Sequence, residues 1–251
     1  MTRALVALAL VAGAAMAAMA GQRRFGPGIP VHPNPPYDGQ FTFVRLRYGP
    51  PVAFASQAIP WSHDYPVGEQ NFMAILNEIT NIRPKLTETS ILGLDDAELA
   101  RHPISYMAEP GFWSMTEAEA AAFRAYLRKG GFVIFDDFSE ARGGWAAFEY
   151  AFQRVLPGAR FYDLDPSHPI FHSFFEIDSF DILPPGYDVG GPVLRGVFED
   201  NDPQRRMLAM INFNTDISEY WETAGFGFRP DWETNEAYKL GINYLIYGMT
   251  H

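Results

Sequence analysis

The chain has 251 residues, 47% of them hydrophobic and 15% aromatic, and its formal net charge is −11 at pH 7. This length accommodates one large α/β domain or two small ones, and the apolar content is sufficient for a packed core. The acidity argues against a nucleic-acid partner, because phosphate backbones are bound through Lys and Arg. The chain contains no cysteine, which excludes disulfides, a cysteine nucleophile and thiolate metal ligands.

Residues 1–20 have the features of a secretory signal peptide. Arg3 precedes an apolar stretch that runs to about residue 15, and Ala18-Met19-Ala20 is a cleavage pattern before Gly21. The stretch is short for a membrane span, which needs about 20 apolar residues. We therefore expect export to the periplasm. The alternative is an uncleaved segment that anchors the protein in the membrane.

Residues 21–40 are rich in Pro and Gly and are expected to form a linker, followed by a single domain at 41–251. Apolar runs predict strands at 41–48, 89–94, 104–108 and 130–138. Helical spacing predicts helices at 69–82, at 145–157 and from the Thr116 capping box to Lys129, with a brief helix at 95–100. Strands that alternate with helices are typical of a parallel sheet covered on both faces.

The second half of the chain is less regular. A short strand is expected at 160–164, and strands at 192–200 and 205–213 are expected to pair as an antiparallel edge. A closing helix is expected at 230–249, with Asp231 as its N-cap.

The strand at 130–138, GGFVIFDDF, ends in two adjacent carboxylates, Asp136 and Asp137. In parallel α/β sheets, ligands bind beyond the carboxyl ends of the strands, which is where these aspartates are expected. They could bind a cation or exchange protons. Alternatively, one of them caps a helix or ties a loop through backbone N–H groups. Successive residues of an extended chain point to opposite sides, so we expect one structural aspartate and one that faces the crevice.

Three other polar groups are candidates for binding. His63 and Asp64 lie in an aromatic loop with Trp61 and Tyr65, and they could line a pocket or simply pack. His168 and His172 have helical metal-site spacing, but Pro169 disfavours the helix, so loop histidines are expected. The alternation of Asn212, Asn214 and Asp216 would suit a hard cation or a turn.

Tryptophans offer a different class of function. Four of the five are expected in or beside loops, where aromatic side chains suit a sugar or protein surface as well as a packed interior. The five are Trp61, Trp113, Trp145, Trp221 and Trp232.

Six ordered motifs resemble the DUF4159 family of exported or membrane-anchored bacterial proteins. They are WSHDYP (61–66), HPISYM (102–107), LRKGGFVIFDDF (127–138), SHPIF (167–171), NFNTD (212–216) and LGINYLIYG (240–248). The resemblance runs from about Phe41 to Gly248. It implies a flavodoxin-like, class I glutamine-amidotransferase-like three-layer sandwich with a mainly parallel sheet and an antiparallel edge. It also matches Asp136 and Asp137 to the family's aspartate pair, and residues 63–66 to its early loop motif.

The chain departs from true amidotransferases at the nucleophile. Those enzymes carry a cysteine at a sharp strand-to-helix turn, and this chain has neither a cysteine nor a G-x-S-x-G elbow. Conventional glutamine-amidotransferase activity is therefore excluded. One hypothesis is a non-catalytic binding or assembly module of the cell envelope, with a protein or glycan partner. The alternative is an envelope glycan or peptide hydrolase that uses Asp136 or Asp137 with His63 or a bound cation. No motif identifies a cofactor or a metal.

Overall fold

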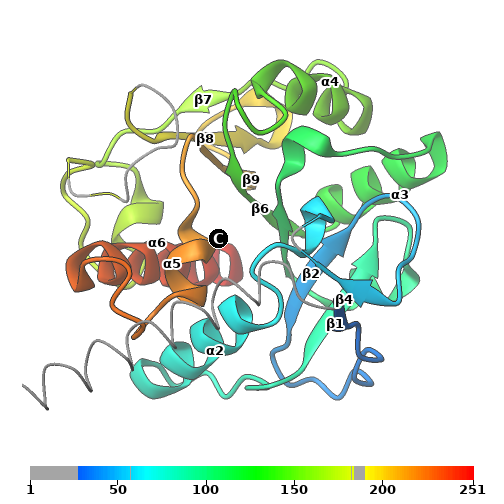
Figure 1. Cartoon of the computed structure of the whole chain (residues 1–251). Helices are drawn as coiled ribbons and strands as arrows, with labels where there is room; N and C mark the ends of the chain where they lie inside the picture. Colours follow the sequence, from blue (N-terminus) through cyan, green and yellow to red (C-terminus); the bar gives the residue numbers. More distant parts are fainter. Residues whose placement is uncertain (1–27, 57, 182, 184–189) are drawn as a thin grey trace, which may run out of the picture.

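The computed structural model describes residues 28–251 except 57, 182 and 184–189 (Figure 1). The expected signal peptide and cleavage site therefore lie outside the described residues. A seven-stranded sheet forms the centre of the molecule. Its strands lie in the order β4 (Thr89–Gly93), β2 (Phe43–Arg47), β5 (Ile104–Ala108), β6 (Phe132–Phe138), β9 (Met207–Phe213), β8 (Val193–Phe198) and β7 (Tyr162–Asp163).

The sheet is mostly parallel. Strands β4, β2, β5, β6 and β9 pair in parallel, whereas β8 and β7 continue the sheet as an antiparallel edge. A separate two-stranded antiparallel sheet joins β1 (Ile29–Pro30) to β3 (Phe54–Ala55). The predicted mixed α/β fold with a mainly parallel sheet and an antiparallel edge is therefore confirmed.

Helices cover both faces of the sheet (Figure 1). On one face lie α3 (Glu117–Arg128) and α4 (Trp145–Val155), and on the other lie α2 (Val67–Ile79), α5 (Ile217–Glu222) and α6 (Asp231–Thr250). The side chains of β6 alternate between the two cores, with Val133 and Phe135 in the first and Phe132 and Ile134 in the second. All seven residues of β6 are buried, as its apolar sequence predicts.

Short 3₁₀ helices connect several of these elements. They are η1 (Pro60–Ser62), η2 (Ala97–Arg101), η3 (Pro110–Phe112), η4 (Pro169–His172) and η5 (Glu199–Asn201). None of the helices in the described part of the chain is both long and apolar enough for a membrane span.

Two local predictions at helix starts can be compared with the structure. The capping box at Thr116 is present, because Thr116 accepts from the Glu119 backbone and Glu119 accepts from the Thr116 backbone. The predicted cap of α6 is wrong. Pro230 is the N-cap without a side-chain hydrogen bond, and Asp231 is the first helical residue. The fixed φ of proline already suits a helix entry, and an acid in the first turn still favours the helix dipole.

Candidate functional site

Asp136 is a structural tie at the end of β6. Its carboxylate is fully buried and accepts four hydrogen bonds. Oδ1 accepts from Asn212 Nδ2 at 3.0 Å, and Oδ2 accepts from the Tyr106 hydroxyl at 2.9 Å. Oδ2 also accepts from the backbone N–H groups of Ile217 and Ser218, at 3.1 and 3.2 Å. These amides belong to the first turn of α5, so Asp136 joins the sheet to that helix.

Asp137 faces a different set of partners. The β6–β9 pairing shifts register between Phe135 and Phe138, and Asp137 has a left-handed φ of 59°. This bulge turns its carboxylate away from that of Asp136. Asp137 Oδ2 lies 3.5 Å from His63 Nδ1, and Oδ1 accepts from Arg142 Nη1 at 3.3 Å.

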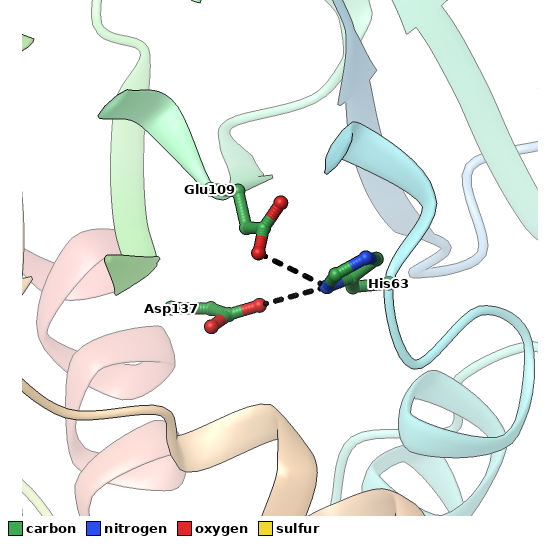
Figure 2. Close-up of side chains that lie close together, drawn as sticks. All are labelled: His63, Glu109 and Asp137. Atoms are coloured by element: carbon green, nitrogen blue, oxygen red, sulfur yellow. Dashed lines mark ion pairs between the residues drawn. The ribbon is translucent and has the colours of Figure 1, made fainter. Parts of the chain in front are cut away.

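Glu109 completes a three-residue group with His63 and Asp137. It follows β5 directly, with a left-handed φ of 45°, and its Oε1 lies 3.2 Å from His63 Nδ1. Figure 2 shows the two carboxylates converging on this ring nitrogen. Glu109 Oε1 also accepts from Arg142 Nη1 at 2.7 Å. The His63 and Arg142 side chains therefore approach the same carboxylate oxygen.

Asp64 and Asp216 extend the cluster beneath Asp137. One carboxylate oxygen from each of Asp64, Asp137 and Asp216 lies within 4.8 Å of the others. The Ser218 hydroxyl lies 2.6 Å from Asp64 Oδ2, 3.0 Å from Asp216 Oδ1 and 2.7 Å from the Tyr106 hydroxyl. Asp216 also caps α5 by accepting from the Glu219 backbone.

The hydroxyl hydrogens of this network are fewer than its contacts. The Tyr106 and Ser218 hydroxyls supply one hydrogen each, but they take part in four oxygen–oxygen contacts, to each other and to Asp136, Asp64 and Asp216. A proton on a carboxyl group would turn one of the remaining two contacts into a hydrogen bond.

Burial and repulsion by neighbouring carboxylates raise the pKa values of Asp64, Asp136 and Asp137. Burial raises the pKa of Asp64 well above its usual range, and Asp216 and Asp137 add to the effect. Burial also raises the pKa of Asp137, with Asp216 next in importance, while the hydrogen bond to His63 opposes the rise. Burial and Asp216 raise the pKa of Asp136 to about 7 despite its hydrogen bonds. The cluster therefore favours bound protons or a cation over full ionisation.

The cluster lies where the strand order reverses. From β2 the chain crosses to β4, which lies next to β2 on one side. It then returns to β5, which lies next to β2 on the other side. His63 and Asp64 lie between β2 and α2, Glu109 follows β5, and Asp137 is the next-to-last residue of β6. In open α/β sheets such a switch point is the usual position of a ligand crevice.

The described residues provide a mixed set of possible metal ligands. His63, Glu109 and Asp137 offer one nitrogen and two oxygens whose atoms lie within 4.8 Å of one another. This set suits borderline cations such as Mn²⁺ or Zn²⁺. Asp64, Asp137 and Asp216 offer oxygens alone, which hard cations prefer. Asp137 belongs to both sets.

Several residues predicted to bind lie outside the cluster. His168 caps η4 by accepting from the Ile170 backbone, and its ring packs on Phe198 and Tyr247. Trp61 and Tyr65 are buried, which leaves His63 and Asp64 as the polar side chains that their loop contributes to the cluster.

The proposed alternation of Asn212, Asn214 and Asp216 is wrong as a single cation site. Asn212 binds Asp136 and the Tyr244 hydroxyl, and Asn214 donates to the Gly191 carbonyl. Strand β9 ends at Phe213 and Asn214 has a left-handed φ of 60°, so the period of two does not continue to Asp216.

The tryptophans do not form an exposed surface. Trp61, Trp113 and Trp221 are buried and Trp145 is partly buried, whereas Trp232 is 52% exposed. The rings of four of them, Trp61, Trp113, Trp145 and Trp221, pack into the two cores or against them. These four therefore do not form an exposed aromatic platform.

Sequence reasoning missed Glu109, Arg142, Tyr106 and Ser218. Glu109 carries a usable signal, because it directly follows a buried strand, as Asp136 and Asp137 end one. Arg142 and Ser218 lie in a turn and a six-residue helix that no periodicity indicates. Their roles depend on contacts that only the fold brings together.

The comparisons with known proteins assign the family. The sequence model of the family described as "Domain of unknown function (DUF4159)" matches residues 42–249. The chain therefore belongs to the DUF4159 family. A search of curated proteins finds no match.

Proposed function

We propose that the protein is an exported ligand-binding module of the bacterial cell envelope, and that a divalent cation held by His63, Glu109 and Asp137 forms part of the bound ligand. The observation that carries the proposal is the convergence of these three side chains at the switch point of the sheet. They come from three separate segments, and both carboxylates approach the same His63 ring nitrogen, as Figure 2 shows.

The charge balance supports a cation. Asp64, Glu109, Asp137 and Asp216 are all buried, whereas the nearby Arg142 is partly exposed. Carboxylates this close repel one another unless a proton or a cation lies between them. A divalent ion would lower the free energy of the ionised cluster and would compete with the protons that burial and mutual repulsion favour.

The order of the strands supports a flavodoxin-like scaffold of the class I glutamine-amidotransferase type. Numbered along the chain, the five parallel strands lie in the order 2-1-3-4-5, the order of flavodoxin-like sheets. Asp137, with its left-handed φ, occupies the strand exit where amidotransferases carry their nucleophile. A carboxylate at this position and the absence of cysteine favour a scaffold that binds without amidotransferase chemistry.

A second candidate is hydrolysis of an envelope glycan or peptide. The observation that favours it is the contact of His63 Nδ1 with two buried carboxylates, because carboxylates orient a histidine and raise its basicity. In this candidate His63 accepts a proton from water, and Asp137 and Glu109 stabilise the resulting imidazolium. A glycan or protein of the envelope is the proposed partner in both cases.

Calorimetric titration of the metal-free protein with MnCl₂, ZnCl₂, CaCl₂ and MgCl₂ tests the cation site. We expect saturable binding of Mn²⁺ or Zn²⁺ with one histidine ligand. Asp137→Asn and His63→Gln should each weaken binding by about tenfold or more. Mutation of groups that only hydrogen-bond to a metal ligand already lowers metal affinity by about tenfold or more. Asp163→Asn, an exposed acid paired with Arg195, is the matched control. Failure of all four ions to bind would refute the proposed cation.

Turnover separates the two candidates. The hydrolase predicts release of product from envelope glycan or peptide fragments by the parent protein and loss of release in His63→Gln. Binding of the same fragments without turnover supports the binding module.

N-terminal sequencing of the secreted protein tests export. We expect the mature chain to begin near Gly21. Recovery of the protein in membranes with Met1 retained would instead identify the N-terminal segment as an anchor.

A further inference from the structure

We propose that Arg142 is a built-in counter-cation of the site, which the bound metal ion displaces. This inference rests on the proposed cation site. It adds regulation: the arginine stabilises the cluster when no cation is bound and sets how strongly a cation must bind in order to replace it.

The first argument is that Arg142 and the proposed metal ion would use the same oxygen, Glu109 Oε1. Arg142 Nη1 donates to Glu109 Oε1 at 2.7 Å and to Asp137 Oδ1 at 3.3 Å. Glu109 Oε1 is also the oxygen 3.2 Å from His63 Nδ1, and it is one of the atoms that the proposed metal would use. A metal ion held by all three residues therefore competes directly with the guanidinium.

The second argument is position. The Arg142 side chain is 38% exposed, whereas those of Glu109 and Asp137 are 5% and 1% exposed. Arg142 thus lies between two buried acids and solvent, at the outer side of the cluster. A long arginine side chain at this position can reach water, where its charge is hydrated, once a metal ion takes over its place beside the two acids.

The third argument is that the backbone holds Arg142 beside Glu109. Arg142 lies in a turn closed by its own N–H and that of Gly144, both of which donate to the Ser139 carbonyl. This turn packs on Gly111, two residues after Glu109, so closely that a Cβ at Gly111 would lie 2.5 Å from the Arg142 carbonyl oxygen. The placement of Arg142 beside Glu109 is therefore built into the fold.

The electrostatic effect on Asp137 agrees with this role. The charge of Arg142 lowers the pKa of Asp137, against the stronger effects of burial and of Asp216, which raise it. The arginine therefore favours the ionised form that a metal requires, and its own charge repels the incoming metal.

The test compares Arg142→Met, Arg142→Lys and Arg154→Met with the parent. Arg154 pairs with the exposed Glu117 on the outer surface of α3 and α4, so its variant controls for the loss of one positive charge. We expect Arg142→Met to bind Mn²⁺ or Zn²⁺ at least about tenfold more tightly than the parent, because a nearby like charge is removed. Arg142→Lys and Arg154→Met should stay close to the parent.

Melting in metal-free buffer gives a second measurement that does not depend on cation binding. Without its counter-cation the cluster should be less stable, so Arg142→Met should melt several degrees below both the parent and Arg154→Met. Added Mn²⁺ or Zn²⁺ should restore the melting temperature of Arg142→Met. Equal or weaker metal binding by Arg142→Met would overturn displacement. Equal melting of Arg142→Met and the parent in metal-free buffer would overturn the counter-cation role itself. If no protein binds a cation, the proposed cation site fails, and the metal-free melting alone decides whether Arg142 stabilises the cluster.

Discussion

Replacing Asp136 and Asp137 separately should have opposite consequences, although the two residues are adjacent. Asp136 accepts from two backbone amides of α5, from Asn212 and from Tyr106. In Asp136→Ala, the Tyr106 hydroxyl keeps Ser218 as a partner. Three buried donors lose their acceptor: the Asn212 side-chain amide and the backbone N–H groups of Ile217 and Ser218. Each such orphan costs about 1–3 kcal/mol, and removal of a buried charge offsets part of the total. We expect a net loss of about 3–5 kcal/mol, and a melting temperature lower by about 6–20 °C.

Asp136→Asn should be milder. The amide oxygen of the new asparagine can accept the three hydrogen bonds that Asp136 Oδ2 accepts in the parent. Its NH₂ group then faces the NH₂ group of Asn212, which in the parent donates to Asp136 Oδ1. Asn212 can resolve that conflict by flipping its amide, because its other partner, the Tyr244 hydroxyl, can donate or accept. A loss of about 1–2 kcal/mol is expected.

Asp137→Asn should leave stability nearly unchanged and abolish cation binding. Burial and the neighbouring acids oppose its charge, so an uncharged side chain relieves repulsion. Asparagine also tolerates the left-handed φ of 59° as well as aspartate does. Thermal and denaturant unfolding followed by circular dichroism measure the melting temperature and the free energy of unfolding of all three variants. Asp136→Ala melting within 2 °C of the parent would refute the structural role, and Asp137→Asn that binds cations normally would refute the site.

Two further outcomes follow from the charged groups around the site. The folded-state pKa of Asp64 is raised, so between about pH 4 and that pKa the folded protein binds more protons than the unfolded chain, and the free energy of unfolding falls as pH rises. Asp64→Asn should flatten this fall between pH 5 and 8 in urea titrations, and an unchanged or steeper slope would contradict the protonation. Buried Arg45 pairs with Glu69 and donates to the Trp61 carbonyl, so it fixes the loop that carries the histidine. Arg45→Met with Glu69→Leu should fold, since apolar replacement of buried pairs is tolerated, but should bind Mn²⁺ several-fold more weakly, whereas Glu69→Gln keeps the Trp61 contact and should bind normally.

Local pattern predicted the secondary structure well where an element carries its own signal. The strand Phe132–Phe138 and the helix Glu117–Arg128 were predictable because apolar periodicity and a capping box lie within each segment. Helix α5 was not, because it has six residues and its first amides bind Asp136, 81 and 82 residues away. Short helices of this kind form through tertiary contacts, which no local window contains.

The location of the candidate cluster was predictable from the sequence, but its membership was less so. The rule that ligands bind at the carboxyl ends of parallel strands directed attention to Asp136 and Asp137, which lie at that edge of the sheet, and applied to β5 it would also have directed attention to Glu109. The rule cannot say which aspartate binds the backbone, because that depends on the bulge between Phe135 and Phe138. It also cannot find Arg142, whose contact with Glu109 spans 33 residues.

The backbone itself distinguishes this edge of the sheet. Six non-glycine residues in the described part of the chain have a left-handed φ, and four of them lie around the site: Asp64, Glu109, Asp137 and Asn214. Aspartate and asparagine tolerate this conformation, but Glu109 at 45° has no such advantage, and left-handed backbone costs a longer side chain about 1–2 kcal/mol. A residue chosen only for stability at this position would be glycine or asparagine. The carboxylate of Glu109 is directed at His63 and Arg142, and its charge is the feature that glycine or asparagine could not supply at this position.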